Sequence, residues 1–175
     1  MPEKKILPSY SGQSVDDLLA MEAGYRIDSL VFAFESALDE KAAQIGYEKL
    51  SEPEKAVLVI QALQRDVREN GYRQFFMNTP VYAAEVVGML KSTGCPKAAE
   101  VSEGAIGALG IKGRITGEAI YDILQELSEG TLETLKEFDR KFTECEEDVT
   151  GILFEYIKKN KNKIKFIKSN NIADE

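Results

Sequence analysis

The sequence predicts an all-α fold, a single domain of about eight helices packed as helical hairpins around a central apolar helix. Apolar residues recur at spacings of three and four along most of the chain, and no run shows the sustained alternation of a β-strand. Glycine, proline and helix-capping residues interrupt these segments at short intervals. The 175 residues, 43% hydrophobic and 30% charged, suit one globular domain. We expect an N-terminal arm over 1–13, the helical domain over 14–160 and a basic tail over 161–175.

Two helices are predicted before the central one. Ser14 and Asp17 have the spacing of a capping box, in which each side chain bonds a free backbone N–H, and Gly24 closes this short helix. A long amphipathic segment follows and ends at Gly46. Its apolar stripe consists of Ile27, Leu30, Val31, Phe34, Leu38, Ala42 and Ile45.

The segment from Ser51 to Pro80 holds the most apolar helical run of the chain. Ser51 and Glu54 have capping-box spacing, and Pro53 is tolerated because it lies in the first turn. The run AVLVIQAL over 56–63 is apolar on nearly every side. Other helices must therefore surround it.

A glycine and a proline punctuate the chain after this run. Asn70 and Gly71 tolerate a left-handed backbone and are expected to end the helix. Thr79 is expected to be the N-cap of the next helix, with Pro80 at its first position. The segment between Gly71 and Thr79 is too short for a long helix.

The glycine-rich segment over 107–117 is the one place that suggests a phosphate-binding loop. It lacks the Gly-Lys-Ser/Thr of such loops and follows no strand. We therefore expect it to connect two helices, one of which begins at Pro96. Thr116 is expected to cap a helix that runs to Gly130, and Thr131 to open the next.

A short motif lies at the end of the central helix. Its residues are Gly71, Tyr72, Gln74, Phe75, Phe76 and Asn78, with Glu69 and Asn70 before them. The motif resembles the signature of the bacterial DNA-mimic-protein family, Asn-Gly-Gly-Phe-x-Gln-Tyr/Phe-Phe-x-Asn-Ser after an apolar helix. Glu69 and Asn70 stand where the signature has Asn-Gly, and Thr79 replaces its serine. The looser resemblance extends from about Leu50 to Tyr156.

The resemblance implies an all-helical fold. For the member that named the family, it also implies an acidic surface that occupies the DNA-binding face of a protein. The residues by themselves suit a structural role for the motif: a helix terminator, an aromatic pair in the core, and Gln74 and Asn78 bonded to backbone groups of the turn.

Charge is distributed unevenly along the chain, whose net charge is −8. Residues 1–157 carry 28 acids and 16 bases, whereas 158–175 carry 6 lysines and 2 acids. The densest excess of acids lies over 118–155. The acids expected to form an interaction face are Glu118, Asp122, Glu126, Glu129, Glu133, Glu137, Glu144, Glu146, Glu147 and Asp148.

This acidic face has two interpretations. Glu118, Asp122, Glu126 and Glu129 are spaced to line one side of a single helix. They could be a solvated face that keeps the protein soluble. They could also attract a basic protein surface, although one helix is too sparse to imitate DNA without neighbouring helices or a symmetric dimer.

The lysines after residue 158 also allow two interpretations. They suit a helix C-terminus, where cations offset the helix dipole. Less simply, Ile164, Phe166 and Ile167 could touch an anionic surface or fold back on the acidic body.

Two classes of function remain open. One is a non-enzymatic interaction module, a DNA mimic that binds a basic, DNA-binding protein and itself binds no nucleic acid, as a possible homodimer. The other is a small-ligand binder or carboxylate-dependent hydrolase, with a pocket at the end of the central helix lined by Glu69, Tyr72, Arg73 and Gln74.

Several classes of site are excluded by composition. The chain has no histidine, which removes Ser-His and Cys-His nucleophiles and imidazole metal sites. Cys95 and Cys145 lack metal-ligand spacing and are expected to be reduced packing thiols. No apolar run could serve as a secretory signal or span a bilayer. The sequence therefore predicts a cytoplasmic protein without a metal or cofactor.

Overall fold

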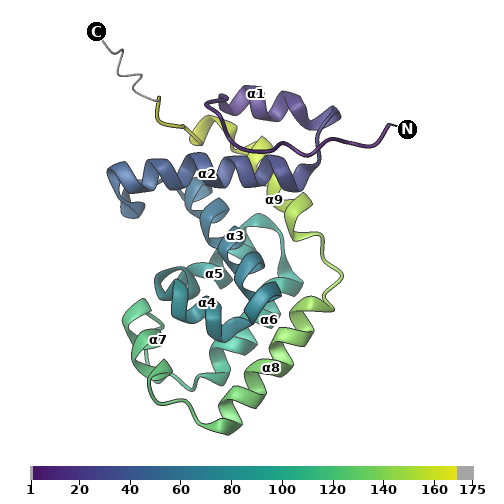
Figure 1. Ribbon diagram of the computed structural model, residues 1–175. Coiled ribbons are helices and arrows are strands. Elements are labelled where there is room, and N and C mark those ends of the chain that lie inside the picture. The colour runs from purple at the N-terminus through teal and green to yellow at the C-terminus, as the bar shows by residue number, and fades with distance from the viewer. Residues whose placement is uncertain (1, 169–175) are drawn as a thin grey trace. The chain divides into compact units, whose positions relative to one another are not determined.

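The computed structural model describes residues 2–168 and confirms the all-α fold (Figure 1). Within this part of the chain the only strand-like pairing is a single bridge between Lys5 and Tyr25. The nine α-helices of these residues are α1 (Val15–Ala20), α2 (Ile27–Ile45), α3 (Glu52–Asn70), α4 (Tyr72–Asn78), α5 (Pro80–Thr93), α6 (Pro96–Ala108), α7 (Gly117–Leu124), α8 (Glu129–Thr143) and α9 (Val149–Lys159).

The predicted local signals at most helix ends are confirmed. Ser14 and Asp17 form a complete capping box at α1, and the Ser51 N–H bonds Oε2 of Glu54 at 3.0 Å at the start of α3. Gly46, Gly71 and Gly94 follow α2, α3 and α5 with positive φ angles. Thr79 is the N-cap residue of α5 and Pro80 its first position, as predicted, but the Thr79 hydroxyl donates to the carbonyl of Phe75 and bonds no N–H of α5.

Residue contacts divide the chain into two compact units. Residues 59–152 form one unit, and residues up to Leu58 form the other together with those from Leu153. Helices α3 and α9 thus contribute residues to both. The expected division into arm, helical domain and tail follows different boundaries and stays a prediction.

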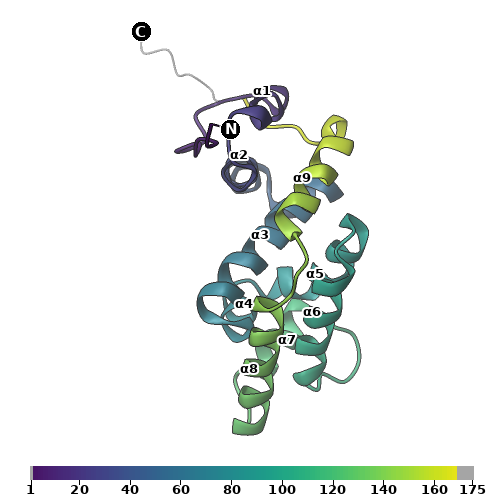
Figure 2. The same cartoon turned by 90° about the vertical axis from the view of Figure 1, so that its right-hand side faces the viewer.

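The unit over 59–152 is a bundle of short helices. Helix α5 packs against α6 and α7, and α8 packs against α6 and α4 (Figure 2). The apolar run of α3 is buried as predicted: Ile60 and Leu63 have no exposed surface. Phe75 and Phe76 of α4 are fully buried too, so the predicted aromatic core pair is confirmed.

The other unit holds α1, α2, the start of α3 and the end of α9. The basic segment after α9 folds back within it, which is one of the alternatives drawn from the sequence, and Lys158 and Lys159 lie in the last turn of α9, as the helix-end interpretation predicts. Ile164 is buried, and the ring of Phe166 lies edge-on to Tyr10 and Phe34 at centroid distances of 5.7 and 5.4 Å. Residues 169–175 of the predicted tail lie outside the described residues.

Polar groups of α2 and α3 hold the main chain of this segment. The Glu54 carboxylate, 2% exposed, accepts the Lys165 N–H at 2.8 Å and the ammonium of Lys41 at 2.7 Å. Lys41 also donates to the Lys165 carbonyl, and the hydroxyl of Ser51 donates to the Lys163 carbonyl at 2.7 Å. The buried carboxylate is thus paired and hydrogen-bonded, as a buried charge must be.

Candidate protein-interaction surface

Gly71 of the sequence motif connects α3 to α4 and lies close to α8. Its φ of +86° is a left-handed conformation that favours glycine. A Cβ at this position would collide with the carboxylate of Asp139 from α8. The same carboxylate accepts the backbone N–H of Tyr72 through Oδ1 at 2.7 Å, which satisfies a free donor at the start of α4.

The Tyr72 side chain is part of the core of this unit. It has no exposed surface, and its hydroxyl shares a 2.9 Å hydrogen bond with the buried hydroxyl of Ser102. Its ring contacts those of Phe76 and Phe142. Burial raises the pKa of Tyr72 far above its usual value. The tyrosine therefore stays protonated and serves packing.

The two polar motif residues bond to side chains and not to the backbone groups predicted from the sequence. Gln74 donates to Asn78 at 2.7 Å, and Asn78 is 3.4 Å from a carboxylate oxygen of Asp66 on α3. Gln74 and Asn78 lie one helical turn apart on α4, so their side chains are neighbours. They therefore bond to each other and not to the backbone groups of the turn before α4.

Asp139 was absent from the residues expected to form the site. It follows Leu132 and Leu135 at spacings of seven and four, so it lies on the inward side of α8. Burial raises the pKa of its carboxyl group above the usual value, and the hydrogen bond from Tyr72 lowers it by less. An acid in an otherwise apolar row was the signal that could have identified it.

The helix expected from Thr116 to Gly130 ends earlier than predicted, and the helix expected from Thr131 begins earlier. Helix α7 ends at Leu124, and α8 begins at Glu129 with Ser128 as its N-cap in place of Thr131. Glu126 lies in the turn, so the four acids from Glu118 to Glu129 do not line one helix. Ser128 is the N-cap because its hydroxyl accepts the Thr131 N–H at 3.1 Å.

Eight of the ten predicted acids have exposed side chains that bind no backbone group of residues 2–168. Glu133 forms an ion pair of 3.0 Å with Lys136 on the surface of α8. No ion pair among residues 2–168 involves the other seven, which are Glu118, Asp122, Glu126, Glu129, Glu137, Glu144 and Glu146. This part of the chain therefore presents uncompensated negative charge.

The last two predicted acids cap helices. Glu147 is half-buried and accepts the N–H groups of Lys97 and Ala98, at 3.1 and 2.9 Å, in the first turn of α6. Asp148 accepts the N–H of Gly151 at 3.0 Å in the first turn of α9. Both positions let the carboxylate satisfy free donors at a helix N-terminus.

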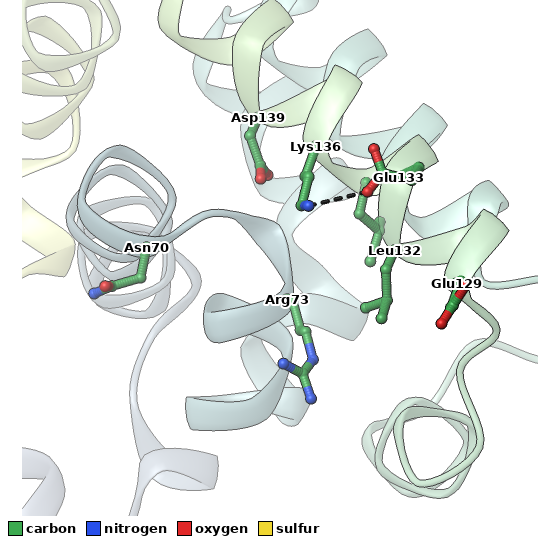
Figure 3. Close-up of a pocket in the computed structure, with 8 residues that line it drawn as sticks. Asn70, Arg73, Glu129, Leu132, Glu133, Lys136 and Asp139 are labelled. Carbon is green, nitrogen blue, oxygen red and sulfur yellow. Dashed lines mark hydrogen bonds and ion pairs between the residues drawn. The ribbon is translucent and has the colours of Figure 1, made fainter.

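A groove of about 560 Å³ separates the start of α4 from α8 (Figure 3). Asn70 and Arg73 line one side, and residues of α8 line the other. Those α8 residues are Glu129, Leu132, Glu133, Leu135, Lys136 and Asp139. The groove thus combines two leucines with three carboxylates and two cations.

The ligand pocket proposed as an alternative is not assembled from the expected residues. Arg73 lines the groove, whereas Glu69 and Gln74 do not, and the Tyr72 side chain is buried. The described residues contain no group of three or more Cys, Asp or Glu side chains that could hold a metal ion. None of the described helices combines the length and apolar content that crossing a bilayer requires.

The model of one protein family, described as DMP19-like protein, matches residues 48–160. The match covers more than half of the chain and includes the motif, α4 to α8 and all ten predicted acids. It agrees with the resemblance to DNA-mimic proteins drawn from the motif. No curated protein and no solved structure matches the chain.

Proposed function

The chain belongs to the DMP19-like protein family, a family of DNA mimics, and we propose that it is a non-enzymatic module that binds a basic protein. In this proposal its acidic surface occupies the DNA-binding face of that partner. The observation that carries the proposal is the set of seven exposed carboxylates without ion pairs between Glu118 and Glu146. Such a surface raises association rates and favours partners of opposite charge.

The charge excess supports the assignment of this surface to one unit of the chain. Residues 59–152 contain 16 acids and 10 bases, a balance of −6, and the rest of the chain has a balance of −2. Acids of α7, of α8 and of the segment after α8 all contribute. Mimicry requires such a combination, because acids four residues apart on one helix are spaced ~6 Å, against one charge per ~1.7 Å of duplex.

A symmetric dimer would double this acidic surface. We propose a homodimer as the form that binds the partner. Sedimentation equilibrium tests this part directly: a mass near twice the 19.5 kDa of the chain is expected, and a monomer at binding concentrations would exclude it.

The main experiment compares two variants with the same change in net charge. The test variant carries Glu118→Gln, Asp122→Asn, Glu126→Gln and Glu129→Gln. The control carries Glu3→Gln, Glu40→Gln, Glu48→Gln and Glu100→Gln, four exposed acids outside the surface. Partners are captured from cell extract on the immobilised chain at low salt and eluted by a salt gradient.

The dissociation constant of a captured partner then distinguishes the variants. At roughly 0.5 kcal/mol per exposed charge, the test variant loses about 2 kcal/mol, or about thirtyfold in affinity, and its salt dependence flattens. The control stays close to wild type. Duplex DNA is expected to compete with the chain for the partner. Equal affinities of the two variants, or lack of competition by DNA, would contradict the proposal.

A further inference from the structure

A second groove, of about 530 Å³, lies between α7 and the loop that precedes it, within the unit of residues 59–152. We name it the α7 groove. Its half-buried apolar side chains are Ile111, Ala119 and Ile123, and its exposed charged side chains are Asp122, Glu126 and Lys112. It contains two carboxylates and a single cation.

The backbone explains why apolar and acidic groups meet here. Ala119 and Ile123 are four residues apart on α7 and share one side of the helix. Asp122 occupies the neighbouring row. Although α7 ends at Leu124, the Glu126 N–H bonds the Ile123 carbonyl at 3.2 Å, so the chain continues to turn and keeps Glu126 beside Asp122.

The two carboxylates of the α7 groove have no ion pair within residues 2–168. Lys112 offsets at most one of them, so the groove keeps a negative charge beside exposed apolar surface. This pairing differs from a plain solvated acidic face, because half-buried Ile111 and Ile123 gain from being covered.

We infer that the α7 groove binds a lysine or arginine side chain of the partner, with its aliphatic stem on Ile111 and Ile123 and its cationic head at Asp122 and Glu126. Long basic side chains bury their methylene stems on apolar surface while the charged head stays in water. This inference rests on the proposed function and names the chemistry that one part of the surface recognises. The aliphatic stem of the basic side chain gains apolar contact in this groove. The phosphate backbone of DNA offers no such contact.

The test uses two short basic peptides of equal length and charge. One is oligolysine, and the other contains 2,4-diaminobutyrate, whose side chain is two methylenes shorter. Binding is measured by calorimetry at a mildly acidic pH at which both ammonium groups are charged. The wild-type chain should bind oligolysine about fivefold more tightly. This gain is smaller than the one that full burial of the two additional methylenes would give.

Two variants with unchanged charge locate the effect. Ile123→Thr removes apolar surface from the α7 groove and should abolish the preference for the longer stem. Ile115→Thr is the matched control, since Ile115 is also half-buried and lies outside the groove. This control should keep the preference, and circular dichroism verifies that both variants remain folded.

The outcomes separate this inference from the proposed function. Equal binding of the two peptides to the wild-type chain, or an unchanged preference in Ile123→Thr, would overturn the groove assignment. In that case the Glu118–Glu129 charge variant could still weaken capture, and the acidic-module proposal would stand. If neither peptide binds at low salt, both proposals fail together.

Discussion

The carboxylate of Asp139 occupies the space into which a side chain on Gly71 would project. The same group accepts the N–H of Tyr72, so one acid of α8 holds the junction of α3 and α4 in place. The motif glycine therefore has two requirements, a left-handed backbone and the absence of a Cβ.

Gly71→Ala should destabilise the protein by about 3 kcal/mol, because it combines a strained backbone with displacement of Asp139. Urea unfolding followed by circular dichroism measures the loss. Gly113→Ala is the control, since Gly113 also has a positive φ, of +93°, but open space around it. It should cost about 1 kcal/mol. Equal losses would show that the contact with Asp139 is unimportant.

Asp139→Asn should make the stability less dependent on pH. Burial raises the pKa of Asp139 in the folded state above 3.8, so the folded protein binds more protons than the unfolded chain just above that pH. This carboxyl group therefore makes stability fall as pH rises through that window, and the asparagine variant should lack that fall. Unfolding in urea across the acidic range tests this, and the same slope in both proteins would refute it.

Asp139→Ala addresses the hydrogen bond of the same group. Asparagine keeps an oxygen that can accept the Tyr72 N–H, whereas alanine leaves this donor without its partner. The alanine variant should lose about 1–3 kcal/mol more than the asparagine variant at neutral pH. Similar stabilities of the two variants would mean that water replaces the carboxylate without cost.

Glu147→Ala should affect folding and leave partner capture unchanged. Its carboxylate caps the first turn of α6, so its removal should cost about 1 kcal/mol of stability. Glu146→Ala, one residue away and exposed, should change stability by less than about 0.5 kcal/mol. Thermal unfolding separates the two. Equal unfolding temperatures would argue against the capping role.

Phe166→Ala should destabilise the unit formed by the two ends of the chain. The ring lies against Tyr10 and Phe34, and its loss should cost about 2 kcal/mol, less than for a fully buried phenylalanine because Phe166 is half-buried. Lys168→Ala, at an exposed position of the same segment, serves as control. A stability equal to that of the control would mean that the segment does not dock in solution.

The helix ends show why part of this structure was predictable. A capping box needs two side chains three residues apart, so Ser51 and Glu54 carry the whole signal between them. At α7 and α8 two signals competed. Thr131 and Gly130 suggested one boundary, but the hydroxyl of Ser128 makes the cap in the structure. Choosing between two neighbouring capping residues requires knowing the direction in which each helix leaves the turn, which the sequence does not give.

The sequence by itself determined the helical class, most helix ends and the excess of acids over 118–148, because each depends on residues close together in the chain. Tertiary structure decided which acids are available to a partner. Tyr72 and Asp139 are 67 residues apart, and Glu147 meets the start of α6 from 49 and 50 residues away. Only packing brings such groups within hydrogen-bonding distance, so it separates the acids that support the fold from those that face solvent.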